Sequence, residues 1–221
     1  MKRRMLRAVK EKWNKALPFV FMALFALSRW PGLFPPNFSV AYAMFFCAGV
    51  YFTRRTAWWL PLGVIILTDV ALNFYYQSKG STVWTGSAIG YQCVNYLAYA
   101  AIIWLGKRYR PGSSTLSLIG GGVLGALLFY LVTNTASWLS NPEYSKTILG
   151  WITALTTGTK GWPQTWEFFR NTLLSGGLFT GVFVAAMKAT APSESPQDKE
   201  AGVRPKAPEE EPEAAPEEAK A

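Results

Sequence analysis

Charged residues are scarce in the long middle part of this sequence, and this scarcity restricts the chain to one kind of environment. Of its 221 residues, 50% are hydrophobic and 16% are charged, and most of the charges lie before residue 16 or after residue 187. A soluble domain of this size carries about 25% charged residues. The middle of the chain therefore has too little polar surface for water, which predicts an all-α, polytopic membrane protein.

Six apolar runs are candidates for transmembrane helices. A helix needs roughly 20 apolar residues to cross the hydrocarbon layer, with about 17 as a lower limit. Breakers and charges separate the runs, such as Pro31, the pair Arg54-Arg55 and the pair Pro111-Gly112. The first two runs are short and depend on their flanks. The predicted transmembrane domain covers residues 16–188, with spans at 16–30, 38–52, 57–75, 86–105, 116–138 and 168–188.

The basic residues predict the orientation of these spans, because Lys and Arg gather on the cytoplasmic side of membrane proteins. With the N-terminus inside, 13 near-membrane Lys and Arg residues lie on the cytoplasmic side and five on the outer side. Both termini are therefore expected in the cytoplasm. Residues 1–15 place apolar side chains at helical spacing between basic ones, which predicts an interfacial helix in contact with membrane lipids.

The C-terminal residues 189–221 have a different composition. They are rich in Ala, Pro and Glu, with nine acidic and four basic residues and no aromatic residue. Such a segment buries too little apolar surface to offset the entropy of ordering. We expect a disordered cytoplasmic tail.

The composition also argues against several function classes. The net charge of +9 would suit a nucleic-acid partner, but the basic residues occur as short clusters between apolar runs, the pattern of membrane loops. The sequence has no His, and its two cysteines, Cys47 and Cys93, fall inside predicted spans. Neither a metal site nor a cofactor is expected from them. No nucleophile–base pair or pair of carboxylates stands out, so an enzyme is not expected.

The polar residues of the spans gather at one depth. In the predicted topology they fall in the outer half of the membrane, whereas the inner halves are apolar or built of small residues, as in 120–126, which let helices approach closely. Asp69 is the only acid within a span and calls for a partner, for which Arg29 and Arg170 are candidates. A plain ion pair between helices and a role in ligand binding both remain open. The candidate solute-binding residues are Arg29, Asn37, Asp69, Asn73, Gln92, Asn95, Asn134, Trp138, Tyr144, Lys146, Thr147, Arg170 and Asn171.

The longest connection, about 29 residues at 139–167, lies outside between the last two predicted spans. It carries several tryptophans, including Trp151, Trp162 and Trp166. Aromatic residues at this level favour an interfacial belt, and a long loop in a compact domain also suits a lid over a binding site.

Five stretches resemble one family in the same order. They read PPNFSVAYAMFFCAGVYF (35–52), LPLGVIILTDVALNFY (60–75), VTNTASWL (132–139), YSKTILGW (144–151) and FFRNTLLSGGLFT (168–180). The chain resembles an uncharacterised family of bacterial six-span inner-membrane proteins, catalogued as a domain of unknown function. The resemblance implies a bacterial inner-membrane location. The sequence departs from the family pattern at Val40, Ser145 and Gly177, lacks the family's histidine, and carries an extra stretch at 156–166.

More distantly, the chain is similar to the S components of energy-coupling-factor transporters, six-span proteins that capture a small nutrient in an outward-facing pocket. Their first span usually carries an Ala-xxx-Ala docking face, where this chain has only Ala23 and Ala26. The leading hypothesis is a protein that binds or transports a small polar solute, together with transporter partner subunits. The alternative is a non-catalytic scaffold whose polar residues only hold helices together. A third, weaker hypothesis is an intramembrane enzyme that relies on Asp69, alone or with Lys146.

Overall fold

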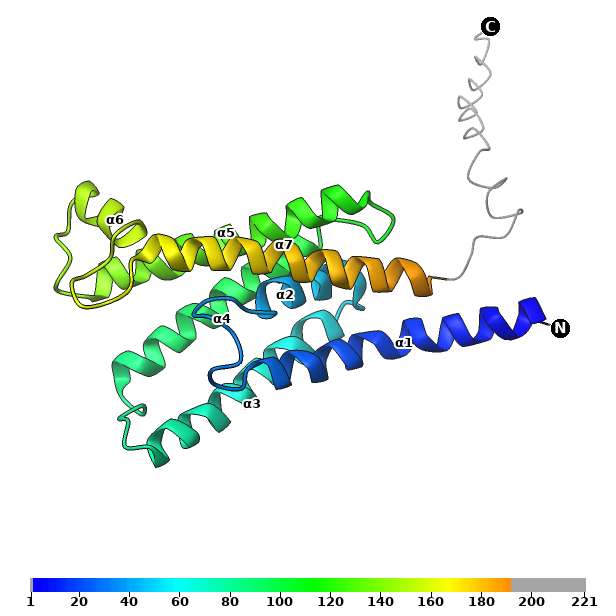
Figure 1. The fold of residues 1–221 in the computed structure, drawn as a ribbon, viewed down its shortest axis with the longest axis horizontal. Coiled ribbons are helices and arrows are strands. Elements are labelled where there is room, and N and C mark those ends of the chain that lie inside the picture. Colours follow the sequence, from blue (N-terminus) through cyan, green and yellow to red (C-terminus); the bar gives the residue numbers. More distant parts are fainter. Residues whose placement is uncertain (1, 192–221) are drawn as a thin grey trace, which may run out of the picture. The chain divides into compact units, whose positions relative to one another are not determined.

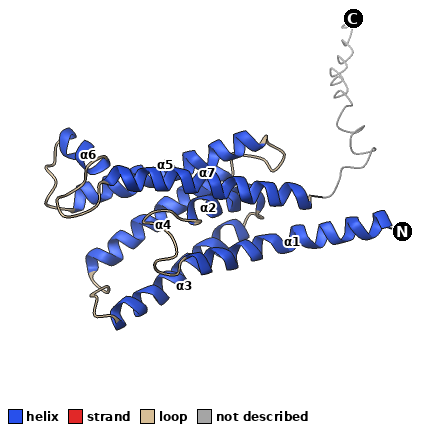
Figure 2. Cartoon of the chain, viewed as in Figure 1, coloured by secondary structure: helices blue, strands red, loops and turns tan. Residues whose placement is uncertain are grey.

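The computed structural model of the chain describes residues 2–191, which form a bundle of α-helices without strands (Figures 1 and 2). The all-α prediction is confirmed for this part of the chain. The helices are α1 Lys2–Ser28, α2 Ala41–Tyr51, α3 Thr56–Ser78, α4 Gly86–Gly106, α5 Thr115–Ser140, α6 Ile148–Leu155 and α7 Thr165–Thr190.

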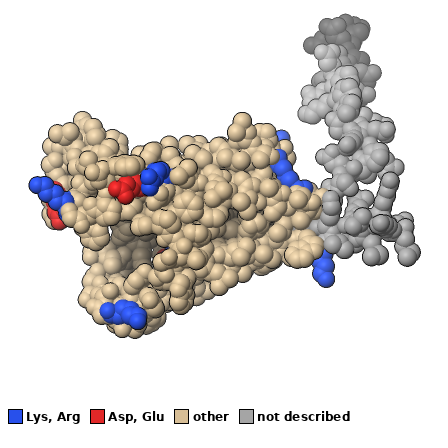
Figure 3. Space-filling view, viewed as in Figure 1, with Lys and Arg blue, Asp and Glu red and all other residues tan. Residues whose placement is uncertain are grey.

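Four of these helices, α3, α4, α5 and α7, are long and apolar enough to cross a membrane. The apolar part of α1, Ala16–Ser28, and the whole of α2 are shorter apolar helices. On the face drawn in Figure 3, a broad uncharged band separates the charged residues at the two ends. The described part of the chain thus has the character of a helical, multi-pass membrane protein.

Helix α2 differs from the predicted span 38–52, because it has only 11 residues. At 1.5 Å per residue it is about 16 Å long, roughly half the thickness of the hydrocarbon layer. Every residue from Ala41 to Val50 is buried, and the helix packs against α1, α3, α4, α5 and α7. Its sequence is apolar on all sides, as expected of a helix surrounded by protein. The turns of 29–40 complete the path from α1 to α2.

The start of the chain also differs from the prediction. Residues 2–15, expected as a separate interfacial segment, belong to the same continuous helix as the first predicted span. No turn separates the two parts, and Pro18 lies inside the helix. At the other end, α7 continues to Thr190. The structure describes the chain only as far as residue 191, so the predicted disordered tail lies outside the described residues from position 192 on.

The connections between helices group at two opposite ends of the bundle. One end is formed by the start of α1, the end of α7 and the connections 52–55 and 107–114 (Figure 1). The opposite end is formed by the connections 79–85, 141–147 and 156–164, together with α6, while the connection 29–40 lies on the same side but nearer the middle of the bundle (Figure 1). At the first end Lys188 Nζ donates a hydrogen bond to the Ser113 carbonyl at 3.0 Å. At the α6 end Asn171 Nδ2 donates to the Pro36 carbonyl, also at 3.0 Å.

Glycines allow the central helices to pack backbone against backbone. A Cβ atom added at Gly49 of α2 would lie 2.3 Å from the Ile103 carbonyl oxygen of α4, and one at Gly106 would lie 2.2 Å from the Phe46 oxygen. In the predicted small-residue run, a Cβ at Gly122 would lie 2.1 Å from the Thr180 hydroxyl of α7. The core beneath the α6 end is therefore tightly closed.

Candidate functional site

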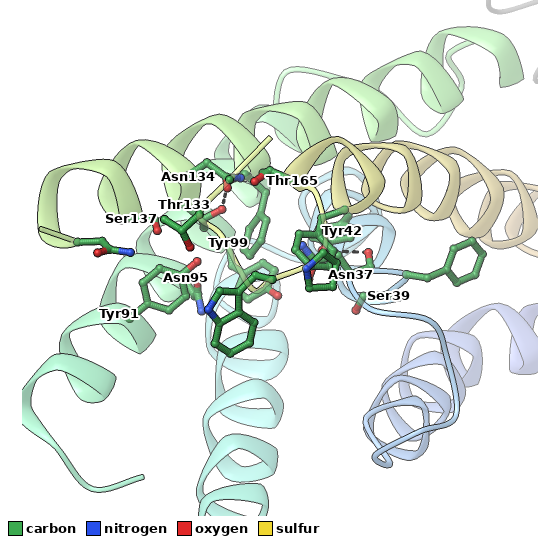
Figure 4. Close-up of a pocket in the computed structure, with 18 of the residues that line it drawn as sticks. Asn37, Ser39, Tyr42, Tyr91, Asn95, Tyr99, Thr133, Asn134, Ser137 and Thr165 are labelled. Carbon is green, nitrogen blue, oxygen red and sulfur yellow. Dashed lines mark hydrogen bonds between the residues drawn. The ribbon is translucent and has the colours of Figure 1, made fainter. Parts of the chain in front are cut away.

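A cavity of about 620 Å³ lies at the α6 end of the bundle. Its walls come from residues before and at the start of α2, from the middle of α4, from the second half of α5 with the loop that follows it, and from segment 158–168 (Figure 4). Figure 3 shows the surface hollowed at this end. The volume falls in the range of roughly 300–1,000 Å³ that is typical of small-molecule sites. Five of the predicted site residues line it: Arg29, Asn37, Asn95, Asn134 and Tyr144.

Asn37 lies in the turn that leads the chain from α1 back into the bundle. Its backbone is in the left-handed region, with a φ of 60°, which asparagine adopts more readily than most residues. Its carbonyl oxygen accepts a hydrogen bond from the Tyr42 hydroxyl at 3.3 Å. This turn brings Asn37, Ser39 and Tyr42 to one side of the cavity (Figure 4).

Arg29, at the end of α1, forms an ion pair with Asp69 of α3. The Arg29 guanidinium donates to Asp69 Oδ1, and the Tyr96 hydroxyl of α4 donates to Asp69 Oδ2 at 3.0 Å. The two charged side chains are 22% and 14% exposed, so the pair is largely buried. Arg29 borders the cavity, while Asp69 lies behind it and does not line it. Of the two candidate partners for Asp69, the structure pairs it with Arg29.

Asn73 and Gln92 bind each other instead of lining the cavity. Asn73 Nδ2 donates to Gln92 Oε1 at 3.5 Å, and Gln92 Nε2 donates to Asn73 Oδ1 at 3.2 Å. This reciprocal amide pair joins α3 to α4, and Asn73 is buried. The two residues therefore satisfy each other between helices, as amides in membrane bundles commonly do.

Trp138, Lys146 and Thr147 hold the loop after α5 and also do not line the cavity. The Trp138 indole donates to the Ser145 carbonyl at 2.8 Å. Lys146 Nζ donates to the carbonyls of Trp138 and Asn141, where a cation stabilises the end of a helix. The Thr147 hydroxyl accepts from the Gly150 amide at 3.2 Å and caps the start of α6. These residues position the loop after α5, which closes one side of the cavity.

The last two predicted site residues lie on the first turns of α7, outside the cavity. Arg170 is exposed, and its guanidinium lies 5.5 Å from the centre of the Trp166 ring. The Asn171 side-chain amide donates a hydrogen bond to the Pro36 carbonyl, and this bond connects α7 to the turn before α2.

In a comparison with protein-family models, residues 10–198 match a family of unknown function (DUF6580). The chain belongs to this family. The match includes α2 to α7 completely and most of α1, so the cavity and its surrounding network lie within it. The curated proteins and the solved structures gave no match.

Several cavity residues of this family member were missed by the sequence analysis, which considered mainly amides and charges. On α4, Tyr91 and Tyr99 stand four residues before and after Asn95, so the three share one helix face. That spacing was a readable signal. On α5, Thr133 and Ser137 are four residues apart, and Asn134 stands three residues before Ser137.

The stretch 156–166 contributes the residues that sequence reasoning could least foresee. Gly158, Thr159, Trp162 and Pro163 line the cavity from this side, although no periodic pattern marks them. Tyr144 joins them from the preceding loop, and burial raises the pKa of its phenol. The Tyr144 hydroxyl therefore stays protonated at neutral pH and can both donate and accept a hydrogen bond.

Proposed function

We propose that this protein binds a small polar solute from the outside of a bacterial inner membrane, in the cavity at the α6 end. In this proposal the chain crosses the membrane six times, with both termini in the cytoplasm. Helix α2 and the turns of 29–40 together make the second crossing. The short α2 leaves room above its first residue, and the cavity occupies that room.

The distribution of basic residues supports this orientation. The end opposite α6 receives the basic connections 52–55 and 107–114 and Lys188, the set that the positive-inside rule assigns to the cytoplasm. Both the cavity and the loops that border it then face outward. Below the cavity the close approach of Gly49 and Gly106 closes the bundle toward the cytoplasm.

The observation that carries the proposal is the cavity itself: about 620 Å³, lined by amides and hydroxyls from α2, α4, α5 and segment 158–168. Polar groups inside a membrane bundle are costly unless they bind each other or a polar ligand. Asn95 Oδ1 is buried and has no hydrogen-bond partner among the described residues. A polar solute in the cavity would supply such a partner.

Transport of the solute would require partner subunits, because the 221 residues contain no phosphate-binding loop of the Gly-x-x-x-x-Gly-Lys type. This part of the proposal follows the expectation from the resemblance to S components, which depend on such partners. The proposal assigns no reaction to the protein itself.

A non-catalytic scaffold is the second candidate function. It is favoured by the predicted polar residues that bind other parts of the bundle, such as the Asn73–Gln92 pair and the Arg29–Asp69 pair. These contacts explain how the helices hold together, but they leave the cavity and the unpartnered Asn95 oxygen without a role.

Filling the cavity should abolish solute binding. Ser137 and Ser140 both lie in the last turn of α5, but only Ser137 lines the cavity. We expect a set of small polar metabolites to contain a solute that raises the thermal unfolding midpoint of the detergent-purified protein. At a hundredfold excess over the dissociation constant the stabilisation is about 2.7 kcal/mol, or roughly 5–10 °C.

The solute should stabilise Ser140→Phe as it does the unmodified protein, and it should not stabilise Ser137→Phe, in which the added ring occupies the cavity. Absence of any stabilising solute would refute the proposal and leave the scaffold function. Equal stabilisation of both variants would place binding elsewhere.

A further inference from the structure

The cavity offers no free charge to an ionised ligand. Arg29 is the only Lys, Arg, Asp or Glu residue among those that line it. Its guanidinium is paired with Asp69, whose second oxygen accepts the Tyr96 hydroxyl. The positive charge is thereby neutralised before a ligand arrives, and an anionic ligand would have to compete with a carboxylate held by two helices.

Aromatic rings form a continuous wall on one side of the cavity. Tyr99 stacks on Phe129, with ring centres 4.7 Å apart and planes at 28°, and on Phe45 at 4.3 Å and 12°. Tyr42 extends this wall, since its ring centre lies 5.0 Å from that of Phe129. Trp162 adds an indole that is 75% exposed and has no ring partner among the described residues. Tyr99 thus has both ring faces covered, whereas the open face of Trp162 can hold a flat ring by offset stacking.

Within residues 2–191, the lining of the cavity contains both an unpaired hydrogen-bond acceptor and an unpaired hydrogen-bond donor, so a ligand could donate to one and accept from the other. Asn95 Oδ1 and Arg29 Nε are buried and lack hydrogen-bond partners among the described residues, and both residues border the cavity. The first atom accepts hydrogen bonds and the second donates them. Asn134 uses one amide hydrogen on the Tyr130 carbonyl at 2.8 Å, which leaves its oxygen free as a further acceptor.

We propose that the solute is an uncharged heteroaromatic compound that carries both hydrogen-bond donors and acceptors, on the ring itself or on an amide attached to it, as uracil or nicotinamide does. This inference rests on the proposed function, because it names the class of solute that the same cavity would bind. The open face of Trp162 holds the plane of the ring against the aromatic wall, and the asparagine amides form hydrogen bonds with its polar edge. A polyol or a free amino acid has no flat heteroaromatic ring that could use both the stacking face and the amides.

Matched sets of compounds test the inference by isothermal titration calorimetry on the detergent-purified full-length protein. Each set contains a neutral heteroaromatic compound, its carboxylate counterpart and its saturated counterpart: uracil, orotate and dihydrouracil; nicotinamide, nicotinate and cyclohexanecarboxamide. Lumazine and hypoxanthine extend the neutral group to two-ring compounds. We expect the neutral aromatic members to bind at least about tenfold more tightly than both counterparts, given the value of stacking and the cost of desolvating a carboxylate that finds no free cation among the described residues that line the cavity.

Variants of the cavity wall complete the test. Trp162→Leu should weaken binding of the best neutral compound about tenfold, while Trp162→Phe, which keeps a ring, should retain most of it. Trp166→Leu is the matched control, because Trp166 is also exposed but does not line the cavity. An unchanged affinity in Trp162→Leu would contradict the inference.

Two further outcomes separate this inference from the proposed function. Tighter binding of the carboxylates or of the saturated compounds, blocked by Ser137→Phe, would overturn the heteroaromatic class and leave solute capture standing. Absence of any binding, both in these sets and among the wider polar metabolites, would overturn both.

Discussion

Gly106→Leu should prevent α2 and α4 from packing together and should give the largest loss of stability among single substitutions in the core. A Cβ at Gly106 would lie 2.2 Å from the Phe46 carbonyl oxygen and 3.0 Å from the Gly49 Cα. Both are backbone atoms, so no rotation of a side chain relieves the clash and the helices must separate. Overpacking costs about 1–3 kcal/mol when side chains can adjust. We expect at least about 3 kcal/mol here.

The thermal unfolding midpoint of the detergent-purified protein measures this loss, which corresponds to roughly 6–12 °C for a chain of this length. Gly90→Leu is the matched control: it lies on the same helix, and a Cβ added there meets no atom within 4 Å. If both variants unfold at the same temperature, the close crossing of α2 and α4 is not present in the protein.

Asp69→Leu should destabilise the protein by about 3 kcal/mol, because it leaves the largely buried Arg29 guanidinium without its carboxylate. We expect this loss of stability to weaken mainly the packing of α1 against the rest of the bundle. An apolar cavity of about 340 Å³, bordered by Phe21 and Val182, lies between α1 and α7, although the rings of Phe21 and Phe183 still pack with their centres 4.2 Å apart. The ion pair therefore adds a polar anchor between α1 and the rest of the bundle to these apolar contacts.

The pair Arg29→Met and Asp69→Leu separates the cost of an unpaired charge from the value of the ion pair. Each single variant should lower the thermal unfolding midpoint, and the double variant should recover at least half of the combined loss, because no buried charge remains. Simple addition of the two losses would contradict direct coupling of Arg29 to Asp69.

The helices that could be predicted are those whose apolar runs are long enough to cross the membrane, whatever they pack against. The spans predicted at 57–75, 86–105, 116–138 and 168–188 each lie within a helix of the structure. Hydropathy alone could not give the length of α2, because an apolar run of 15 residues fits both a thin membrane crossing and a buried helix. Packing on all sides decides between them, and packing is not visible in one sequence.

The partner of Asp69 could be foreseen as a choice between two arginines. The sequence analysis placed Arg29 and Arg170 at the same depth, and only the tertiary structure brings Arg29 against the carboxylate. Glycine pairing shows the same limit. The run 120–126 predicts close helix packing because it is rich in small residues. Gly49 and Gly106 are isolated in the sequence, and their contact is visible only in the tertiary structure.

The sequence predicted the depth of the candidate site in the bundle, but not which residues line it. Depth alone brought Asn95 and Asn134 together correctly with Asn37, since all three line the cavity. It could not tell them from Asn73 and Gln92, which lie near the same level and bind each other. Whether an amide faces a cavity or another amide depends on the rotation of its helix, and that rotation follows from the packing of every neighbour.

The most direct test of outward solute capture is the side from which a cysteine in the cavity can be labelled. Cys93→Ala removes the exposed native thiol, and Cys47 is fully buried. In this background Ser137→Cys places a thiol in the cavity, and Gly112→Cys places one in the connection between α4 and α5, where an added Cβ meets no atom within 4 Å.

A membrane-impermeant maleimide is added to right-side-out membrane vesicles and, separately, to inverted vesicles. We expect the cysteine at position 137 to be labelled in right-side-out vesicles and to be protected by the solute found by thermal stabilisation. The cysteine at position 112 should be labelled only in inverted vesicles. Labelling of position 137 only in inverted vesicles would place the cavity on the cytoplasmic side and contradict capture of a solute from outside.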